Sequence, residues 1–177
     1  MKIILNYMTC ILNKWWLAML LLLLTCGTTS LPAMTWNDFR NDRTLTPENL
    51  IRKFANFKFK LFDAVQSRDT FLSTQIGDCD DFATLAADAL REKGYTTKLV
   101  AVFTAKQAHV VCYVKEAGAY LDYNNRKKPS PLVPTDGSLA DIARKVARSF
   151  GAPWCSVLEY TFKNGVKRAV ATDFPQA

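Results

Sequence analysis

The chain has 177 residues, of which 49% are hydrophobic and 22% charged. This balance suits one globular domain with a real core, and it excludes collagen, coiled coil and intrinsic disorder. The formal net charge is +7, and the basic residues are spread along the chain, which favours contact with an anionic membrane surface. The N-terminal segment predicts export, so we expect no nucleic acid as a partner.

Residues 1–30 differ from the rest of the chain. Their only charges are Lys2 and Lys14, and a run of five leucines follows at 20–24. This run is too short for a spanning helix and is typical of the apolar region of a signal peptide. We therefore predict that residues 1–30 are a signal peptide, a lipoprotein signal or a membrane anchor, and that 31–177 form the exported domain.

The cysteines give two further expectations. Cys26 stands in Leu-Leu-Thr-Cys-Gly, which is similar to a lipoprotein signal box with Cys26 as the lipidated residue, and ordinary signal cleavage is the alternative. Outside this segment three cysteines remain, Cys79, Cys112 and Cys155. An odd number in an exported protein indicates a free thiol. If Cys79 is free, either Cys112 pairs with Cys155 or both are buried free thiols.

The chain before Cys79 predicts little regular structure. Residues 31–45 have no clear period, and a short helix starts at Thr46, with Pro47 at its first position. Alternation in 57–61 predicts a short strand. A polar connection over 63–74 then leads to the cysteine.

The stretch Gly77-Asp78-Cys79-Asp80-Asp81-Phe82-Ala83 predicts a loop that runs into a helix. Asp78 is a good N-cap, Asp81 completes a near capping box, and the helical apolar pattern ends at Gly94. Cys79 therefore falls in the first turn, where free N–H groups and the helix dipole favour a thiolate.

After Gly94 the period changes to two. Strands are predicted consecutively without helices between them, then a helix and a hairpin, which indicates an α+β fold with an antiparallel sheet. The predicted strands are 96–104, 109–115 and 119–123, the helix is 139–150, and the hairpin strands are 154–162 and 166–172.

Three residues have the chemistry of a thiol acyl-transfer enzyme. Cys79 supplies a nucleophile, His109 is the only histidine of the chain, and Asp122 could orient the imidazole if the sheet register puts both on one face. The structural alternatives are a buried thiol, a core histidine and a strand-end aspartate. A zinc site is disfavoured, because no second Cys or His stands at ligand spacing.

The blocks Gly77 to Ala83, Ala108-His109-Val110-Val111 and Tyr120-Leu121-Asp122 resemble the transglutaminase-like superfamily, and more narrowly its bacterial cysteine peptidases. The resemblance covers roughly residues 45–125. It implies a papain-like core, in which a cysteine-bearing helix packs on an antiparallel sheet that carries the histidine and the aspartate.

The resemblance also implies roles. Cys79 would attack a peptide or glutamine carboxamide carbonyl of a protein or peptide substrate, His109 would transfer the proton, and Asp122 would orient His109. The Cys79 N–H and the Gln75 side chain are the candidates for the oxyanion hole. The chain departs from many members at Val110-Val111, where they have Ala-Trp, and this leaves the substrate open.

Some related periplasmic proteases bind calcium through acidic residues that flank the cysteine. Asp78 and Asp80 stand at matching places, and carboxylate oxygens suit calcium. The alternative is that Asp78 caps the helix and Asp80 stabilises its first turn. No other cofactor is expected.

Together these patterns predict an exported cysteine protease, periplasmic or membrane-anchored in a bacterial envelope. A transglutaminase or deamidase is the second reading, because it would use the same thioester. A non-catalytic envelope binding module with a degenerate transglutaminase-like fold is the alternative from another class.

Overall fold

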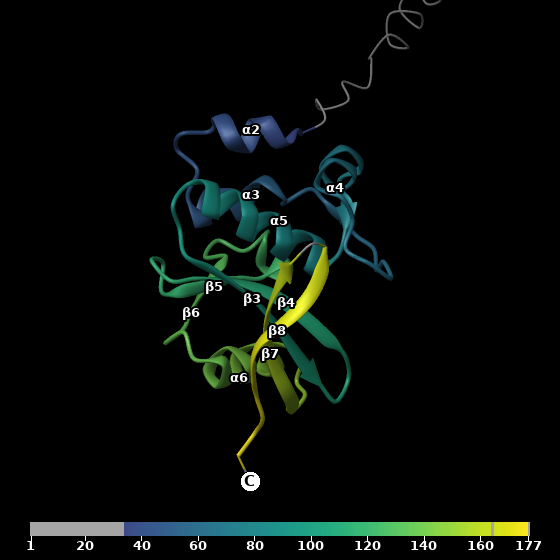
Figure 1. Cartoon of the computed structure of the whole chain (residues 1–177), viewed down its shortest axis with the longest axis vertical. Helices are drawn as coiled ribbons and strands as arrows, with labels where there is room; N and C mark the ends of the chain where they lie inside the picture. The colour runs from purple at the N-terminus through teal and green to yellow at the C-terminus, as the bar shows by residue number, and fades with distance from the viewer. Residues whose placement is uncertain (1–33, 164, 177) are drawn as a thin grey trace, which may run out of the picture. The chain divides into compact units, whose positions relative to one another are not determined.

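The structure is a computed structural model that describes residues 34–163 and 165–176. The predicted signal segment 1–30, including Cys26, lies outside the described residues. Within the described part, helices cover both faces of a central sheet: α2 to α5 lie on one side and α6 on the other (Figure 1).

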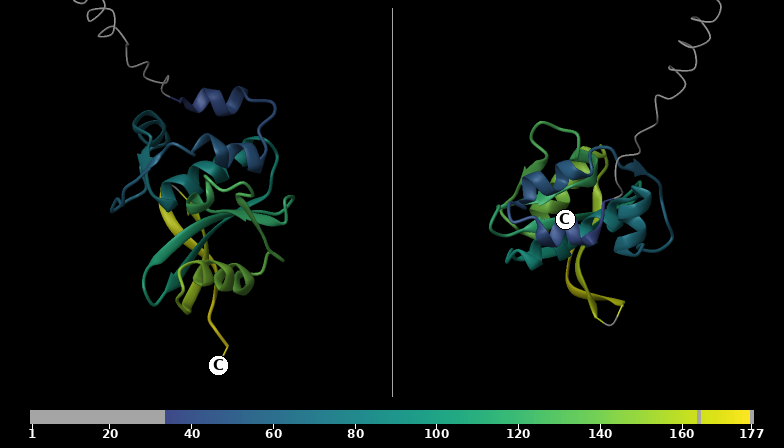
Figure 2. Two further views of the ribbon diagram at one scale, coloured as in Figure 1. Left: turned by 180° about the vertical axis from the view of Figure 1, so that it is seen from behind. Right: turned by 90° about the horizontal axis from the view of Figure 1, so that it is seen from above.

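The central sheet is antiparallel throughout, which confirms the predicted α+β class. Its six strands follow the order β6-β5-β4-β3-β7-β8, so the consecutive strands of the sequence are largely neighbours. Strands β7 and β8 form a hairpin that projects from the rest of the described chain (Figure 2, right). The bounds are β3 (Thr97–Thr104), β4 (Ala108–Val114), β5 (Ala119–Leu121), β6 (Leu132–Pro134), β7 (Trp154–Lys163) and β8 (Val166–Asp173).

The first face of the sheet is covered by the N-terminal helices and by a small parallel sheet. These elements are α2 (Trp36–Asn41), α3 (Pro47–Lys53), β1 (Lys58–Phe59), α4 (Arg68–Thr74), β2 (Ile76–Gly77) and α5 (Cys79–Glu92). The inner face of α5 packs in one core cluster with the β3 residues Leu99 and Ala101 and with Cys112 of β4.

The second face is covered by α6 (Leu139–Ser149). Ile142 and Val146 of this helix pack against Val100, Val102 and Val111. Strands β3 and β4 are therefore buried on both faces, and alternate residues of each strand belong to different core clusters.

Besides the short strand β2, two helices and a strand lie in segments for which the sequence predicted no regular structure. The segments expected to be irregular contain α2, whose N-cap Thr35 forms a capping box with Asp38, and α4, whose N-cap Ser67 accepts from the Thr70 N–H. The segment between the predicted strand 119–123 and the predicted helix 139–150 contains the edge strand β6, where Pro134 is tolerated because one side of an edge strand needs no partner.

The disulfide alternative is wrong, because Cys79, Cys112 and Cys155 are all free. Cys112 lies on β4 opposite Leu99 of β3. Cys155 lies on β7, which pairs with the other edge of β3, and it follows Trp154, the partner of Thr104. The free-thiol alternative holds, although Cys155 is exposed rather than buried.

The start of α5 is fixed by two aspartates, as the sequence predicted. Asp78 Oδ1 accepts from the backbone N–H groups of Asp80 and Asp81, at 3.2 and 3.5 Å, and Asp81 Oδ2 accepts from the Asp78 N–H at 3.1 Å. This capping box makes Cys79 the first residue of the helix.

The same two carboxylates hold the loop that precedes α4. Asp78 Oδ2 accepts from the Phe62 N–H at 2.9 Å. Asp81 accepts from the Gln66 N–H and from Gln66 Nε2, both at 2.6 Å. The position before Asp78 has room only for a glycine, Gly77, since a Cβ there would lie 2.7 Å from Asp81 Oδ2 and against the Phe71 ring.

We expect Asp81→Ala to lower the free energy of unfolding by about 2–3 kcal/mol, because it leaves the Gln66 and Asp78 N–H groups without their buried acceptor. Asp88→Ala on the same helix is the matched control. Asp88 is a surface residue in exposed ion pairs, so its loss should cost less than about 1 kcal/mol. Equal midpoint shifts of the two variants in urea would contradict this role of Asp81.

Candidate active site

Cys79 presents its thiol at the N-terminus of α5. The residue is partly exposed, and it packs at the margin of the main core cluster. In residues 34–163 and 165–176, no hydrogen-bond partner is found for its backbone N–H, because the Asp78 cap serves the next two N–H groups instead. A free N–H therefore lies on the cysteine itself.

His109 and Asp122 are brought together by the register of β4 and β5. Cys112 lies opposite Leu121, and continuing this antiparallel register puts Asp122 opposite Val111, on the same face as His109. The His109 Nε2 atom lies 2.8 Å from Asp122 Oδ1. The condition that the sequence left open is therefore met.

This pair is buried, with 3% of His109 and 2% of Asp122 exposed. Asp122 Oδ1 also accepts from the Asn124 N–H at 2.9 Å, which caps the short 3₁₀ helix η1 (Tyr123–Asn125). This helix replaces the end of the strand predicted to run to 123. The Phe150 ring, at the end of α6, packs edge-on against the imidazole with 5.0 Å between the ring centres.

The surroundings of His109 favour its charged form. Burial opposes a charged imidazole, but hydrogen bonding to Asp122 and to Cys79, with the negative charges of both, outweighs it and raises the pKa of His109 to about 10. Because Nε2 is engaged by Asp122, Nδ1 is the nitrogen available to the thiol. An imidazolium beside a helix N-terminus favours the thiolate form of a cysteine.

Cys79 and His109 open onto one cavity of about 250 Å³. The sequence had singled out only these two of its residues. The others carry no motif, although Gln107 and Ala108 immediately precede His109 and Asn124 follows Asp122 by two positions. The lining residues are Phe59, Leu61, Cys79, Gln107, Ala108, His109, Asn124 and Phe150.

Gln75 has a different position from the one expected for an oxyanion donor. It is the left-handed residue (φ 55°) that ends α4, and its carbonyl accepts from the Lys58 N–H. Gln75 is not among the residues that line the cavity. The contact that Gln75 makes with β1 is therefore through its backbone carbonyl and not through its amide side chain.

Asp78, Asp80 and Asp81 form a carboxylate cluster whose ligand oxygens lie within 4.8 Å of one another. Both oxygens of Asp78 and both of Asp81 already accept hydrogen bonds, whereas Asp80 Oδ1 is buried with no partner in the described part of the chain. These contacts favour the capping role of Asp78. Calcium takes 6–8 oxygens, so here it would have to share the capping oxygens, and calcium binding stays a prediction.

The acidity of Asp80 is perturbed by its surroundings. Burial, a hydrogen bond that the protonated Asp80 donates to Asp78, and the charges of Asp78 and Asp81 raise the pKa of Asp80 to about 7, and Lys167 of β8 acts in the opposite direction. An ionised Asp80 is therefore a source of repulsion at the start of α5.

The sequence of this chain matches a known family. A family model of the transglutaminase-like superfamily matches residues 41–170, almost three quarters of the chain. The chain belongs to this superfamily. Its cysteine-bearing helix on an antiparallel sheet is the transglutaminase-like, papain-like core that the sequence predicted. Comparison with curated proteins gives no significant match, and the narrower assignment to the bacterial peptidases stays a prediction.

Among the helices of residues 34–163 and 165–176, none has both the length and the apolar character needed to span a bilayer.

The raised pKa of His109 makes the stability of this transglutaminase-like domain depend on pH. A folded-state pKa of about 10, against about 6.5 for a free imidazole, stabilises the fold fully below about pH 6.5, and this stabilisation is lost as the pH rises towards 10. We expect Asp122→Asn to lower the free energy of unfolding by roughly a few kcal/mol near neutral pH and by much less near pH 10.

Urea melts across this pH range test that expectation, with Asp88→Asn as the surface control. The control should lower the free energy of unfolding by the same small amount at every pH, because the arginine partners of Asp88 stay charged. A pH-independent effect of Asp122→Asn would mean that Asp122 does not hold a charged His109.

Asp80 gives an independent prediction with the same sign. Its folded pKa lies above the unfolded value, so the wild type should lose stability as the pH rises from about 4 to about 7. Asp80→Asn should remove this loss and be the more stable protein at pH 8 in the presence of a chelator. If calcium binds, millimolar Ca²⁺ should raise the melting temperature of the wild type at pH 8 and not that of Asp80→Asn. Parallel pH profiles of the two proteins would contradict the raised pKa.

Proposed function

We propose that this transglutaminase-like protein is an exported cysteine hydrolase, in the first place a protease, with Cys79, His109 and Asp122 as its catalytic residues. The observation that carries the proposal is the buried His109–Asp122 pair, 2.8 Å apart, sharing a cavity with a partly exposed thiol at a helix N-terminus. A structural cysteine or a core histidine would not need this arrangement.

In the first half of the reaction the Cys79 thiolate attacks the carbonyl carbon of a peptide bond. Negative charge develops on the carbonyl oxygen, and the unpartnered N–H of Cys79 is one donor for it. The second donor is a side-chain amide of the cavity, Gln107 or Asn124, rather than Gln75. His109 gives its proton to the departing amine, and a thioester on Cys79 remains.

In the second half a water molecule attacks the thioester. His109 accepts a proton from this water, the carbon–sulfur bond breaks, and the free acid leaves with Cys79 again a thiolate beside an imidazolium. Asp122 holds the ring in one orientation throughout through its bond with Nε2. An amine in place of water would give transamidation, and a glutamine carboxamide in place of the peptide bond would give deamidation.

The envelope location of this activity is part of the proposal. It is supported by the apolar and weakly charged pattern of residues 1–30 and by the net charge of +7, which suits an anionic membrane surface. Its substrates would then be proteins or peptides of the same compartment.

We expect residues 31–177 to cleave members of a degenerate peptide library, detected by mass spectrometry as new amino termini. Cys79→Ala should abolish the products, and His109→Gln should lower their rate by about 10²–10⁴-fold. Cys155→Ala is the matched control, because Cys155 is a free, exposed thiol outside the cavity, and it should retain full activity.

The same experiment separates the alternatives. Products that gain an added amine, or a carboxyl in place of a carboxamide, would identify transamidation or deamidation. Cys79→Ala should keep the wild-type free energy of unfolding, since the side chain is only partly buried. If product formation survives in Cys79→Ala, the mechanism is wrong.

A further inference from the structure

One edge of the small sheet beside the cavity is open from Phe59 onward, whereas on the same side Arg126 Nη2 donates to the Phe57 carbonyl at 3.0 Å. The Lys58 N–H donates to the Gln75 carbonyl at 2.9 Å, and the Lys60 N–H donates to the Gly77 carbonyl at 3.0 Å. Alternate residues of an extended strand point their N–H groups in opposite directions, so those of Phe59 and Leu61 point away from β2. Within the described residues, neither N–H has a hydrogen-bond partner.

The side chains at this edge are apolar and exposed. Phe59 is 52% and Leu61 72% exposed, and both line the cavity that contains Cys79. Ala108 and Phe150 complete an apolar wall, and no charged side chain other than those of Cys79 and His109 in their ionised forms lines the space. Large apolar side chains left exposed at a concave site mark a binding surface.

The open edge is also rigidly placed relative to the nucleophile. Strand β1 pairs with β2, which ends at Gly77, two residues before Cys79. The other end of the segment is held where Asp78 accepts from the Phe62 N–H. A chain lying along the outer side of β1 would therefore be positioned by the same contacts that fix the start of α5.

We propose that the substrate is an extended peptide segment that pairs with the free edge of β1 at Phe59 and Leu61, with a bulky, uncharged apolar side chain in the cavity beside Cys79. Strand addition of this kind takes affinity from main-chain hydrogen bonds and specificity from a side-chain pocket. The cavity of about 250 Å³ exceeds the roughly 150 Å³ of a protein cavity that holds benzene, so a leucine or phenylalanine side chain fits. This inference rests on the proposed function of Cys79.

The test uses tripeptidyl chloromethyl ketones, which alkylate a reactive cysteine while their peptide part occupies the substrate site. Reagents with leucine, phenylalanine, glycine or aspartate at the last or the penultimate residue are compared, each rate being divided by the rate of iodoacetamide with the same protein. At one of the two positions, leucine or phenylalanine should react at least about tenfold faster than glycine, and aspartate should react most slowly.

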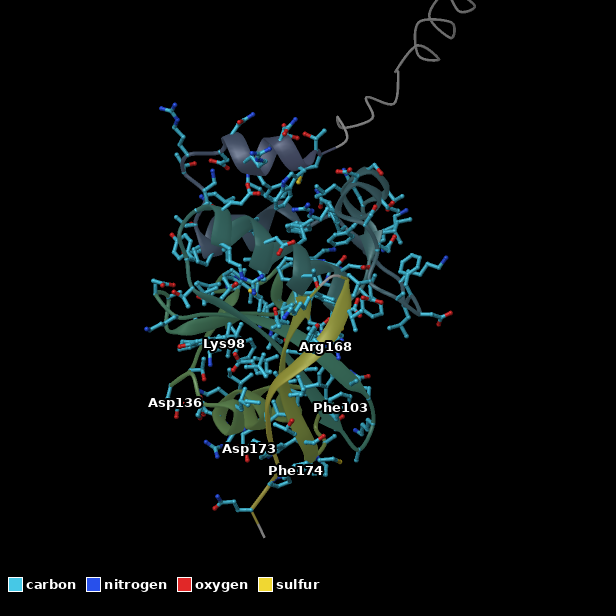
Figure 3. The ribbon with its side chains drawn as sticks, viewed as in Figure 1. Lys98, Phe103, Asp136, Arg168, Asp173 and Phe174 are labelled. Atoms are coloured by element: carbon cyan, nitrogen blue, oxygen red, sulfur yellow. The ribbon has the colours of Figure 1, made fainter. Side chains whose placement is uncertain are left out.

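Two variants and one modified reagent locate the effect. Leu61→Gln should reduce the preference for leucine over glycine by at least about threefold, because it removes part of the apolar contact with the leucine side chain. Val170→Gln is the matched control and should retain the preference, because Val170 is similarly exposed, at 59%, but lies outside the cavity. Val170 belongs to β8, the strand that carries Arg168 and Asp173, which are labelled in Figure 3. Methylation of the reagent's backbone nitrogens should slow it about tenfold by blocking strand pairing.

The outcomes distinguish the two proposals. If Cys79 reacts readily with iodoacetamide, but leucine and glycine reagents react alike and methylation has no effect, the substrate inference is overturned while the catalytic proposal stands. If Cys79 is no more reactive towards iodoacetamide than Cys155, the catalytic proposal fails, and the inference fails with it.

Discussion

The reciprocal cap between Asp78 and Asp81 is the interaction on which the rest of the site depends. It ends β2, starts α5 at Cys79, and leaves the N–H of that residue free. The remaining oxygens of the two carboxylates hold the loop that contains Phe62 and Gln66. One pair of buried carboxylates therefore fixes both the start of the helix that carries Cys79 and the loop that follows Leu61, a residue that lines the cavity. Buried carboxylates are costly unless they are well hydrogen-bonded, and here each is bonded by backbone or side-chain N–H groups.

The second constraint is the sheet. Alternation along β4 puts His109 on the same face as Val111, which packs against α6, whereas Cys79 comes from a helix on the opposite face. The two meet because His109 is the second residue of β4, at the end of the strand. Both core clusters therefore contribute to the site: one carries the thiol, and the other, through Phe150 and the pairing with Asp122, holds the imidazole.

The sequence was sufficient where the controlling interactions are local. The cap at Asp78, the helix of Cys79 and the strands that carry His109 follow from residues close together in the chain, and the superfamily resemblance supplied their order. Phe59 and Leu61 were not recognised, because an exposed strand and a half-buried one have the same alternating pattern. Gln75 was one candidate for the oxyanion hole, but it ends α4 in a left-handed conformation and is not among the residues that line the cavity. The Cys112–Cys155 alternative was an argument from cysteine number, and only the strand order shows the two thiols on opposite sides of β3.

The central claim is that Cys79 and His109 form a thiolate–imidazolium pair held by Asp122. The most direct measurement is the rate of iodoacetamide labelling at Cys79, located by peptide mass mapping, near pH 6 and near pH 9, for residues 31–177 and for His109→Gln. Free thiols become protonated, and therefore slow, well below about pH 8.5. The wild type should label nearly as fast at the lower pH as at the higher one, and His109→Gln should lose most of its rate at the lower pH. A steep fall in the wild type, unchanged by the substitution, would show that the pair is not formed and would point to a binding module.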